Sequence, residues 1–369
     1  FFIGLLRIFA GIFEPLALLQ MGLSLLSFFL FLRLYKLIYK KNSLPLWMLA
    51  FLFLYPAQFI YSNLIMAEIL FQFLLMLSLY TFMKGWENSD GKYFIVHALA
   101  LAAALLCKPV MYLLIPIHFL SFLYLGSKRK SILIVISGLI PLLILGTYTY
   151  RNYQLTDYVH VSSVQNINLI QYPVAYVLER EIGKDAADAK IDDIHEKGRA
   201  EGSFAAEQTY WAREIKEILL RYPLTYVGLH AKGMFNFFLD PGRFDLYHVF
   251  EISNSEGLMA IFGKKGYKGI FSYLSRQPIF LLICLGGIFL LNMIKLLAFL
   301  YMMFQKKTAA YQKWAIVLLV GYLAGVTGVM GASRFAVPVY FMLLLCLPPL
   351  MDKAHILISK LGPNKRKAY

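Results

Sequence analysis

The chain has 369 residues, of which 59% are hydrophobic and 15% charged, and its mean hydropathy is +0.62. The charged share is well below the about 25% usual in soluble proteins. The apolar runs are continuous, whereas barrel strands alternate over about ten residues, so the composition predicts an all-α polytopic membrane protein. The net charge of +15 comes mainly from short connections between apolar runs. That distribution is typical of membrane topology and argues against a nucleic-acid partner.

The apolar segments divide the chain into five parts. Residues 1–14 are too short to span a bilayer. Because the chain begins with Phe rather than Met, we expect them to be the interfacial end of a truncated first extracytoplasmic loop. Residues 15–150 are predicted to form six transmembrane helices and residues 277–350 three more. Between them lies a mainly helical domain at 151–276, and a basic cytoplasmic tail follows at 351–369. The predicted spans are 15–35, 45–61, 64–83, 93–107, 109–125, 131–150, 277–300, 313–331 and 335–350.

The distribution of lysine and arginine fixes the predicted orientation. One set of alternate connections, with the tail, contains seventeen basic residues, and the opposite set of short connections, with the N-terminal segment, contains only Arg7, Lys108 and Arg334. Since basic residues favour the cytoplasmic side, the 151–276 domain is predicted to be extracytoplasmic. This domain has sixteen of the twenty-one acidic residues and fifteen basic ones, so its charge is nearly balanced. Lys295, near the inner end of the seventh span, is expected to snorkel to the cytoplasmic interface.

Three helices are predicted within the 151–276 domain. Residues 184–196 form a polar helix whose aspartates share one face, which favours a solvated surface over a metal site. Residues 205–222 form an amphipathic helix with one apolar stripe. The segment 224–239 is apolar enough to resemble a span, but counting it would place the later basic loop and tail outside. We therefore predict a helix lying on the outer membrane surface, followed by a turn at 240–243.

Charged residues at bilayer depth are the candidates for function, because burying a charge in lipid is costly. Glu68 follows an outer turn, Lys108 lies in the tight turn before Pro109, and Arg334 opens the last span. Arg151 and Asn152 lie where the sixth span leaves the membrane. Each has a structural interpretation, as a paired buried acid, a snorkelling lysine or an interfacial anchor. The functional interpretation is a lipid-phosphate site, since Arg offers a bidentate fork and Lys a point charge.

Several short motifs occur in order along nearly the whole chain. They are Leu54-Tyr55-Pro56 with Met66-Ala67-Glu68-Ile69-Leu70, Cys107-Lys108-Pro109, Tyr150-Arg151-Asn152, Arg221-Tyr222-Pro223-Leu224-Thr225-Tyr226 with Lys232-Gly233, and Ser333-Arg334-Phe335 with Pro338. In this order and topology the chain resembles the C-type, multi-spanning glycosyltransferases that use polyprenyl-phosphate sugars. The resemblance is to the dolichyl-phosphate-mannose–protein mannosyltransferase group, which is family 39-like.

The resemblance implies a C-type glycosyltransferase-like helix bundle with an outward-facing active site, in a bacterial inner membrane. The activity implied is inverting transfer of a sugar from a polyprenyl-phosphate donor to an acceptor hydroxyl on a protein, lipid or glycan. In that family an aspartate of the first extracytoplasmic loop is the base, and here the expected base precedes Phe1, so the catalytic residue is unknown. The residues expected to bind substrate are Glu68, Lys108, Arg151, Asn152 and Arg334.

Cofactors and alternative functions complete the sequence-based expectations. No cofactor is expected, because the lipid-linked sugar is a substrate, and no metal-ligand spacing occurs in the sequence, although a divalent metal is left open. The expected partners are the donor, membrane lipid and the acceptor. One alternative is a transporter or flippase of lipid-linked sugars, which predicts inverted repeats and broken helices near the midplane. The other is a non-catalytic envelope assembly protein.

Overall fold

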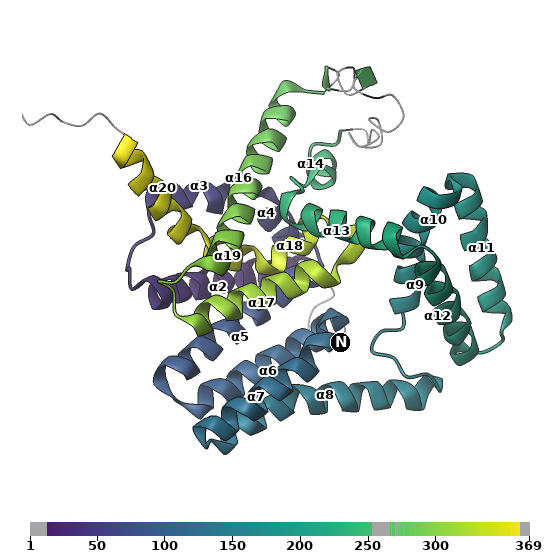
Figure 1. The fold of residues 1–369 in the computed structure, drawn as a ribbon, viewed down its shortest axis with the longest axis horizontal. Helices are drawn as coiled ribbons and strands as arrows, with labels where there is room; N and C mark the ends of the chain where they lie inside the picture. The colour runs from purple at the N-terminus through teal and green to yellow at the C-terminus, as the bar shows by residue number, and fades with distance from the viewer. Residues whose placement is uncertain are drawn as a thin grey trace, which may run out of the picture.

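The computed structural model describes residues 13–252 and 277–361, with a few positions between 266 and 275. Every regular element in these residues is a helix (Figure 1), so the predicted all-α class is confirmed. The prediction for residues 1–14 falls almost wholly outside the described residues, as does the end of the chain after Leu361.

The helices form three consecutive groups. The first comprises α2 (Phe13–Tyr39), α3 (Leu46–Phe53), α4 (Pro56–Asn63), α5 (Ala67–Asn88), α6 (Gly91–Cys107), η1 (Pro109–Leu113), α7 (Leu114–Arg129) and α8 (Ile132–Thr156). The second, which we call the central domain, comprises α9 (Gln165–Leu169), η2 (Ile170–Val174), α10 (Ala175–Ile182), α11 (Lys184–Ala200), α12 (Phe204–Arg221) and α13 (Pro223–Leu239). The third comprises α14 (Arg243–Val249), α16 (Ile279–Phe304), α17 (Ala310–Val326), η3 (Gly328–Met330), α18 (Ser333–Ala336), η4 (Val337–Val339), α19 (Tyr340–Leu344) and α20 (Leu347–Leu361).

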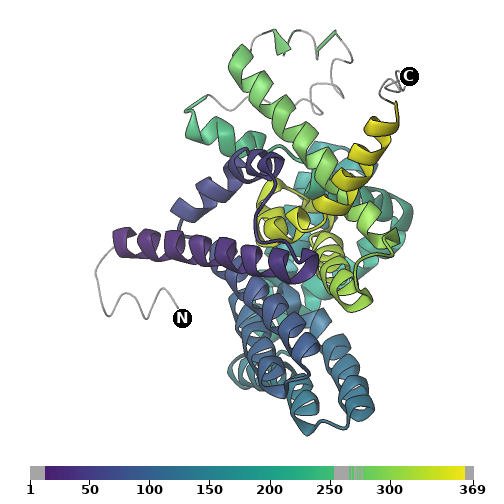
Figure 2. The same cartoon turned by 90° about the vertical axis from the view of Figure 1, so that its left-hand side faces the viewer.

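Within the residues that the structure describes, five helices are long and apolar enough to cross a membrane, namely α2 from Pro15, α5, η1 with α7, α8 and α16. A sixth span is added if the bent pair of α18–α19 and α20 is one crossing. The apolar α6 and α17 have 17 residues each, which is the lower limit for a span. The protein is therefore a membrane protein. In Figure 2, helices α5 to α8 extend to one side of α2. Helices α16 and α20 extend to the opposite side of α2.

The predicted span at 45–61 is not one helix. It consists of α3 and α4, with eight residues each, joined at Leu54 and Tyr55. Each is about 12 Å long at 1.5 Å per residue, so neither crosses a bilayer alone. The cause is Pro56 at the start of α4, because a proline disfavours helical backbone at the preceding residue. The expectation of one continuous helix over 45–61 is wrong.

The predicted last span at 335–350 is also interrupted. Its chain passes from α18 through η4 to α19 and then bends by 58° into α20. Residues 336–349 are all buried, as expected for a segment that is apolar on every face. Pro338 lies within η4 at the first irregularity. The helix then continues to Leu361, so the predicted tail at 351–369 begins as part of α20.

The central domain has its own hydrophobic core. Buried side chains of η2, α10, α11 and α12 meet around Trp211, whose indole Nε1 donates a hydrogen bond of 3.1 Å to the carbonyl of Ile194. The amphipathic helix predicted at 205–222 is α12, and it begins where Ser203 accepts a hydrogen bond from the backbone of Ala206. The polar helix predicted at 184–196 is α11, whose aspartates at 185, 188 and 192 are exposed.

Helix α13 joins this domain to the membrane helices. Tyr226 and Leu229, near its start, pack against the central-domain core, whereas Phe237, near its end, is buried in the main core. The helix crosses the η3 turn so closely that a Cβ atom on Gly233 would lie 2.0 Å from the Gly328 carbonyl oxygen. Helix α13 packs against η3, α16 and α18, and its predicted place on the outer membrane surface stays a prediction.

Candidate functional site

Three of the charged residues singled out in the sequence meet at one end of the bundle. Glu68 lies in the first turn of α5, Lys108 at the extended residue after α6, and Arg334 in α18. The Oε1 atom of Glu68 accepts hydrogen bonds from Lys108 Nζ at 3.0 Å and from Arg334 Nε at 2.6 Å. The structure thus brings together residues 40 and 266 positions apart in the sequence.

The exposure of these side chains increases from the acid to the arginine. The side chain of Glu68 is 1% exposed, that of Lys108 is 20% and that of Arg334 is 42%. Within the described residues Arg334 forms this one ion pair, through Nε, so the two terminal nitrogens of its guanidinium group are available to another acceptor. In the contact of Glu68 with Lys108 and Arg334, two cations face one carboxylate. The terminal nitrogens of Arg334 can therefore bind an anionic oxygen group from outside the bundle.

The backbone beside Arg334 is held by two aspartates and a tyrosine. The Ser333 amide donates to Asp240 Oδ2 at 2.8 Å and the Ser333 hydroxyl donates to Asp245 Oδ2 at 2.9 Å. The Tyr55 hydroxyl donates to the Ser333 carbonyl at 3.3 Å. All three polar groups of Ser333 are therefore bonded, which fixes the starting point of the Arg334 side chain.

Asp240 caps the end of α13, and Asp245 lies in the first turn of α14. The Asp240 side chain also accepts from the Gly242 amide at 3.1 Å, which closes the turn predicted at 240–243, and Gly242 has the positive φ that such a turn requires. Asp245 receives a second hydrogen bond, from the Tyr61 hydroxyl of α4 at 2.9 Å. Figure 1 shows α4, α14 and α18 near one another, in agreement with their contacts.

Burial changes the acidity of Asp245. Loss of hydration raises the pKa of its carboxyl group, and the hydrogen bonds from Tyr61 and Ser333 and the nearby charge of Arg334 only partly oppose this. A carboxylate with a raised pKa is a better proton acceptor than an ordinary surface aspartate. Asp245 is thus a second acid at the site, and the sequence analysis did not select it.

Lys295 also lies near this site. The prediction that its side chain snorkels to the cytoplasmic interface is wrong. Its side chain does not snorkel to an interface, because the residue is 4% exposed in the interior of the bundle. Its Nζ lies 4.2 Å from the ring centre of Tyr55 and 4.9 Å from that of Tyr340, which stack on each other. One helical turn earlier, Asn292 donates to the Asp240 carbonyl at 2.9 Å. Lys295 is therefore a buried cation that is connected to Ser333 through Tyr55, which contacts both residues.

Arg151 and Asn152 are not brought into this cluster by any recorded contact of the described residues. Arg151 donates to the Asn152 side chain at 3.1 Å, and Asn152 donates to the His160 carbonyl at 3.1 Å. Both therefore stabilise the end of α8 and the loop that leaves it. Their predicted substrate-binding role stays a prediction.

Metal ligands do not gather at the site. In the described part of the chain no three His, Cys, Asp or Glu side chains lie close enough together to hold a metal ion.

Five residues at this site were not among the candidate site residues predicted from the sequence, namely Tyr55, Tyr61, Asp240, Asp245 and Ser333. For Asp240 and Asp245 the sequence does contain an indication, since two acids lie at and just after an Asp-Pro-Gly turn that follows an apolar helix. The hydrogen-bond partners of Asp245 are Tyr61 in α4 and Ser333 in α18, which are 184 and 88 residues away in the sequence. No sequence motif joins these residues to Asp245.

The fold and the site define an all-helical membrane protein with a buried carboxylate between two cations at one end of its bundle. In comparisons with protein-family models, with curated proteins and with solved structures, no match to the chain was found. The resemblance to the polyprenyl-phosphate-dependent glycosyltransferases stays a prediction based on the sequence motifs.

Proposed function

We propose that the protein is a membrane glycosyltransferase that takes a sugar from a polyprenyl-phosphate donor and transfers it to an acceptor hydroxyl. The observation that supports this most is the arrangement of Lys108 and Arg334 on one oxygen of the buried Glu68. Arg334 is fixed at its backbone by Ser333 and at its Nε by Glu68, and its terminal nitrogens are left for a ligand. A preorganised guanidinium group of this kind suits a phosphate, which accepts two parallel hydrogen bonds.

The apolar part of such a donor also has a place to bind. A cavity of about 490 Å³ lies along α8, lined by aliphatic and aromatic side chains that include Leu142, Leu145 and Tyr153. Leu142 and Leu145 also pack against the main core, to which Leu105 and Met111 on either side of Lys108 belong. We assign this cavity to the first isoprene units of the donor.

In the proposed reaction the acceptor oxygen attacks the anomeric carbon while the bond from that carbon to the phosphate oxygen breaks. The polyprenyl phosphate leaves with the electron pair, and its growing negative charge is stabilised by Lys108 and Arg334. The acceptor proton passes to a general base. Among the described residues we assign this role to Asp245, which lies beside Arg334 and has a raised pKa because it is buried.

The test is sugar transfer from a polyprenyl-phosphate donor by the full chain in purified membranes, at matched expression. Arg334→Ala and Lys108→Ala should each lower turnover about 10²–10³-fold, the usual effect of losing one donor that stabilises developing charge. Arg334→Lys should recover part of it, since a point charge replaces the fork. The matched control is Lys128→Ala, which removes a basic residue from the last turn of α7. Normal turnover in both alanine variants would refute the assignment.

A specific observation also favours the second candidate, a transporter or flippase of lipid-linked sugars. Two interrupted helices, α3–α4 and α18–α20, meet around the buried Lys295 through Tyr55 and Tyr340. Interrupted helices around a buried charge are typical of transport sites. Translocation of a fluorescent polyprenyl-phosphate sugar across proteoliposomes, with no sugar transferred in detergent solution, would favour this function over the transferase.

A further inference from the structure

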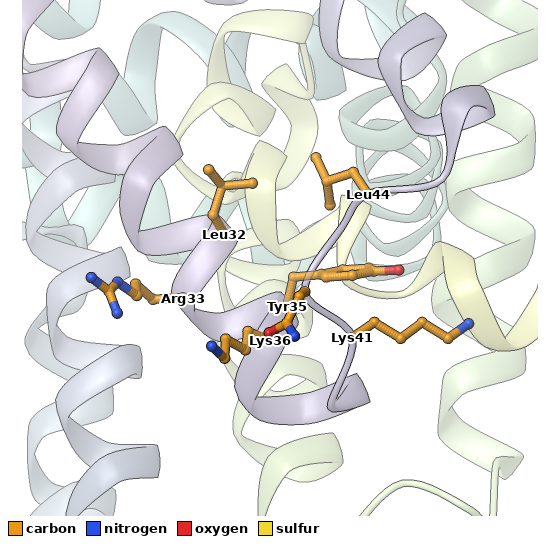
Figure 3. A pocket seen from close by; sticks show the side chains of 7 residues that line it. Leu32, Arg33, Tyr35, Lys36, Lys41 and Leu44 are labelled. Carbon is orange, nitrogen blue, oxygen red and sulfur yellow. The ribbon is translucent and has the colours of Figure 1, made fainter.

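A second charged pocket lies away from the Glu68 cluster, where α2 ends and the chain turns toward α3. Its cavity has a volume of about 190 Å³ (Figure 3). The lining includes two leucines, Leu32 and Leu44, and three basic residues, Arg33, Lys36 and Lys41. By the distribution of basic residues, this end of α2 belongs to the predicted cytoplasmic side.

One lining residue has an unsatisfied polar group. Tyr35 is 2% exposed, and its hydroxyl has no hydrogen-bond partner among the described residues. A buried hydroxyl without a partner costs free energy, and such groups in proteins usually have a ligand or water as partner. The neighbouring Tyr39 differs, because its hydroxyl donates to the Leu345 carbonyl. The free hydroxyl is therefore specific to the residue that lines the pocket.

The cations of the pocket are also free of acidic partners in the part of the chain that the structure describes. Lys40, between them in the sequence, pairs with Glu87 at 2.7 Å, whereas Arg33, Lys36 and Lys41 form no ion pair with a described residue. Figure 3 shows the Tyr35 hydroxyl and Lys41 extending to one side, and Arg33 and Lys36 to the other. The Asp352 carboxylate of α20 also interacts electrostatically with Tyr35. Three cations and this one acid give a net charge of +2.

We propose that this pocket binds the phosphate group of an anionic ligand at the membrane surface. Tyr35 donates a hydrogen bond to a phosphate oxygen, Lys41 supplies the adjacent charge, and Lys36 acts across the opposite edge. Leu32 and Leu44 provide apolar contact for the glycerol and acyl carbons of a phospholipid. A lipid headgroup and free phosphate share the chemistry recognised here, and basic pockets beside membrane helices are suited to anionic headgroups.

The experiment uses the full chain in nanodiscs of phosphatidylcholine that contain phosphatidylglycerol, with retained lipid counted by native mass spectrometry. A parallel titration adds inorganic phosphate to the protein in neutral-lipid nanodiscs. Lys41→Gln should weaken anionic-lipid retention about fivefold, and Tyr35→Phe about tenfold, because the latter removes only the hydroxyl. Asp352→Asn should leave retention intact or strengthen it.

The control is the double variant Lys128→Gln with Lys130→Gln, which removes two exposed lysines at the α7–α8 connection, outside the pocket. Selective loss of phosphatidylglycerol in the pocket variants would support a lipid ligand, and selective loss of inorganic phosphate would support a soluble one. An equal loss in the control, or no loss in Tyr35→Phe and Lys41→Gln, would overturn the proposal. A loss in Asp352→Asn would also overturn it, since the tyrosine would then act through that acid.

Discussion

Replacing Glu68 by glutamine tests whether this acid is the centre of the charged cluster. Glutamine keeps the size of the side chain but removes the charge that Lys108 and Arg334 share. Breaking a fully buried ion pair costs about 3–5 kcal/mol, whereas an exposed pair contributes less than about 1 kcal/mol. Lys108 and Arg334 are 20% and 42% exposed. We therefore expect an intermediate loss of about 2–3 kcal/mol in the free energy of unfolding for Glu68→Gln.

The assay is thermal unfolding of the purified protein in nanodiscs at a fixed heating rate. For a chain of this size the loss corresponds to a fall of about 3 °C in Tm. Combining Glu68→Gln with Lys108→Met should cost less than the sum of the two single changes, because the second removes a cation that the first leaves unpaired. An additive result would show that the bridge contributes no interaction energy.

The matched control is Glu87→Gln. Glu87 also pairs with two lysines, Lys40 at 2.7 Å and Lys84 at 3.4 Å, but its side chain is 32% exposed and that of Lys40 is 68% exposed. The expected change for this variant is below about 0.5 kcal/mol. Equal effects of Glu68→Gln and Glu87→Gln would contradict the argument that burial makes the Glu68 bridges important.

Three further predictions concern the rest of the chain. Gly233→Ala should lower the free energy of unfolding by about 1–3 kcal/mol or more, because the new Cβ atom meets backbone atoms of the η3 turn. Thermal unfolding measures this loss, and a neutral effect would contradict the close packing. His195 has a pKa lowered mainly by burial, so the folded state favours the neutral ring. The central domain should lose stability as pH falls below about 6.5, and Trp fluorescence should show this loss removed in His195→Gln. Cysteine introduced at Ser203 should react with an impermeant reagent from outside intact cells, and cysteine at Lys128 should not; the reverse pattern would invert the predicted topology.

The site was partly predictable because bilayer depth can be read from the order of spans and loops. Glu68, Lys108 and Arg334 were placed at one depth by the loops they adjoin, and the structure shows them in direct contact. Lys295 was misplaced for a related reason. The sequence placed it near the inner end of the seventh span, but its ammonium group lies against Tyr55, whose hydroxyl bonds to Ser333. Rotation about the helix axis decides whether a side chain faces lipid or the core, and composition does not fix that rotation. The ring stack of Tyr55 and Tyr340 determines it here.

The fold was predictable where a segment is long and bounded by polar residues, as in α2, α5, α8 and α16. It was not predictable where proline interrupts an apolar run, as before Pro56 and around Pro338. Hydropathy measures the apolar character of such a run and not its continuity as a helix. The Asp245 contacts were missed because they join loops far apart in the chain, whose pairing depends on how the whole bundle closes.

The position of α13 has a practical consequence for dividing the protein. One helix of 17 residues contributes side chains to two cores, with Leu229 in the first and Phe237 in the second. A fragment that ends before α13 would lack part of the packing around Trp211, and one that includes all of α13 would expose its terminal phenylalanines to water. The same helix also packs directly against the η3 turn, which lies just before Arg334 in the chain. A helix about 25 Å long therefore connects the Trp211 core to the segment that leads into the charged cluster, and a cut within it would separate the two.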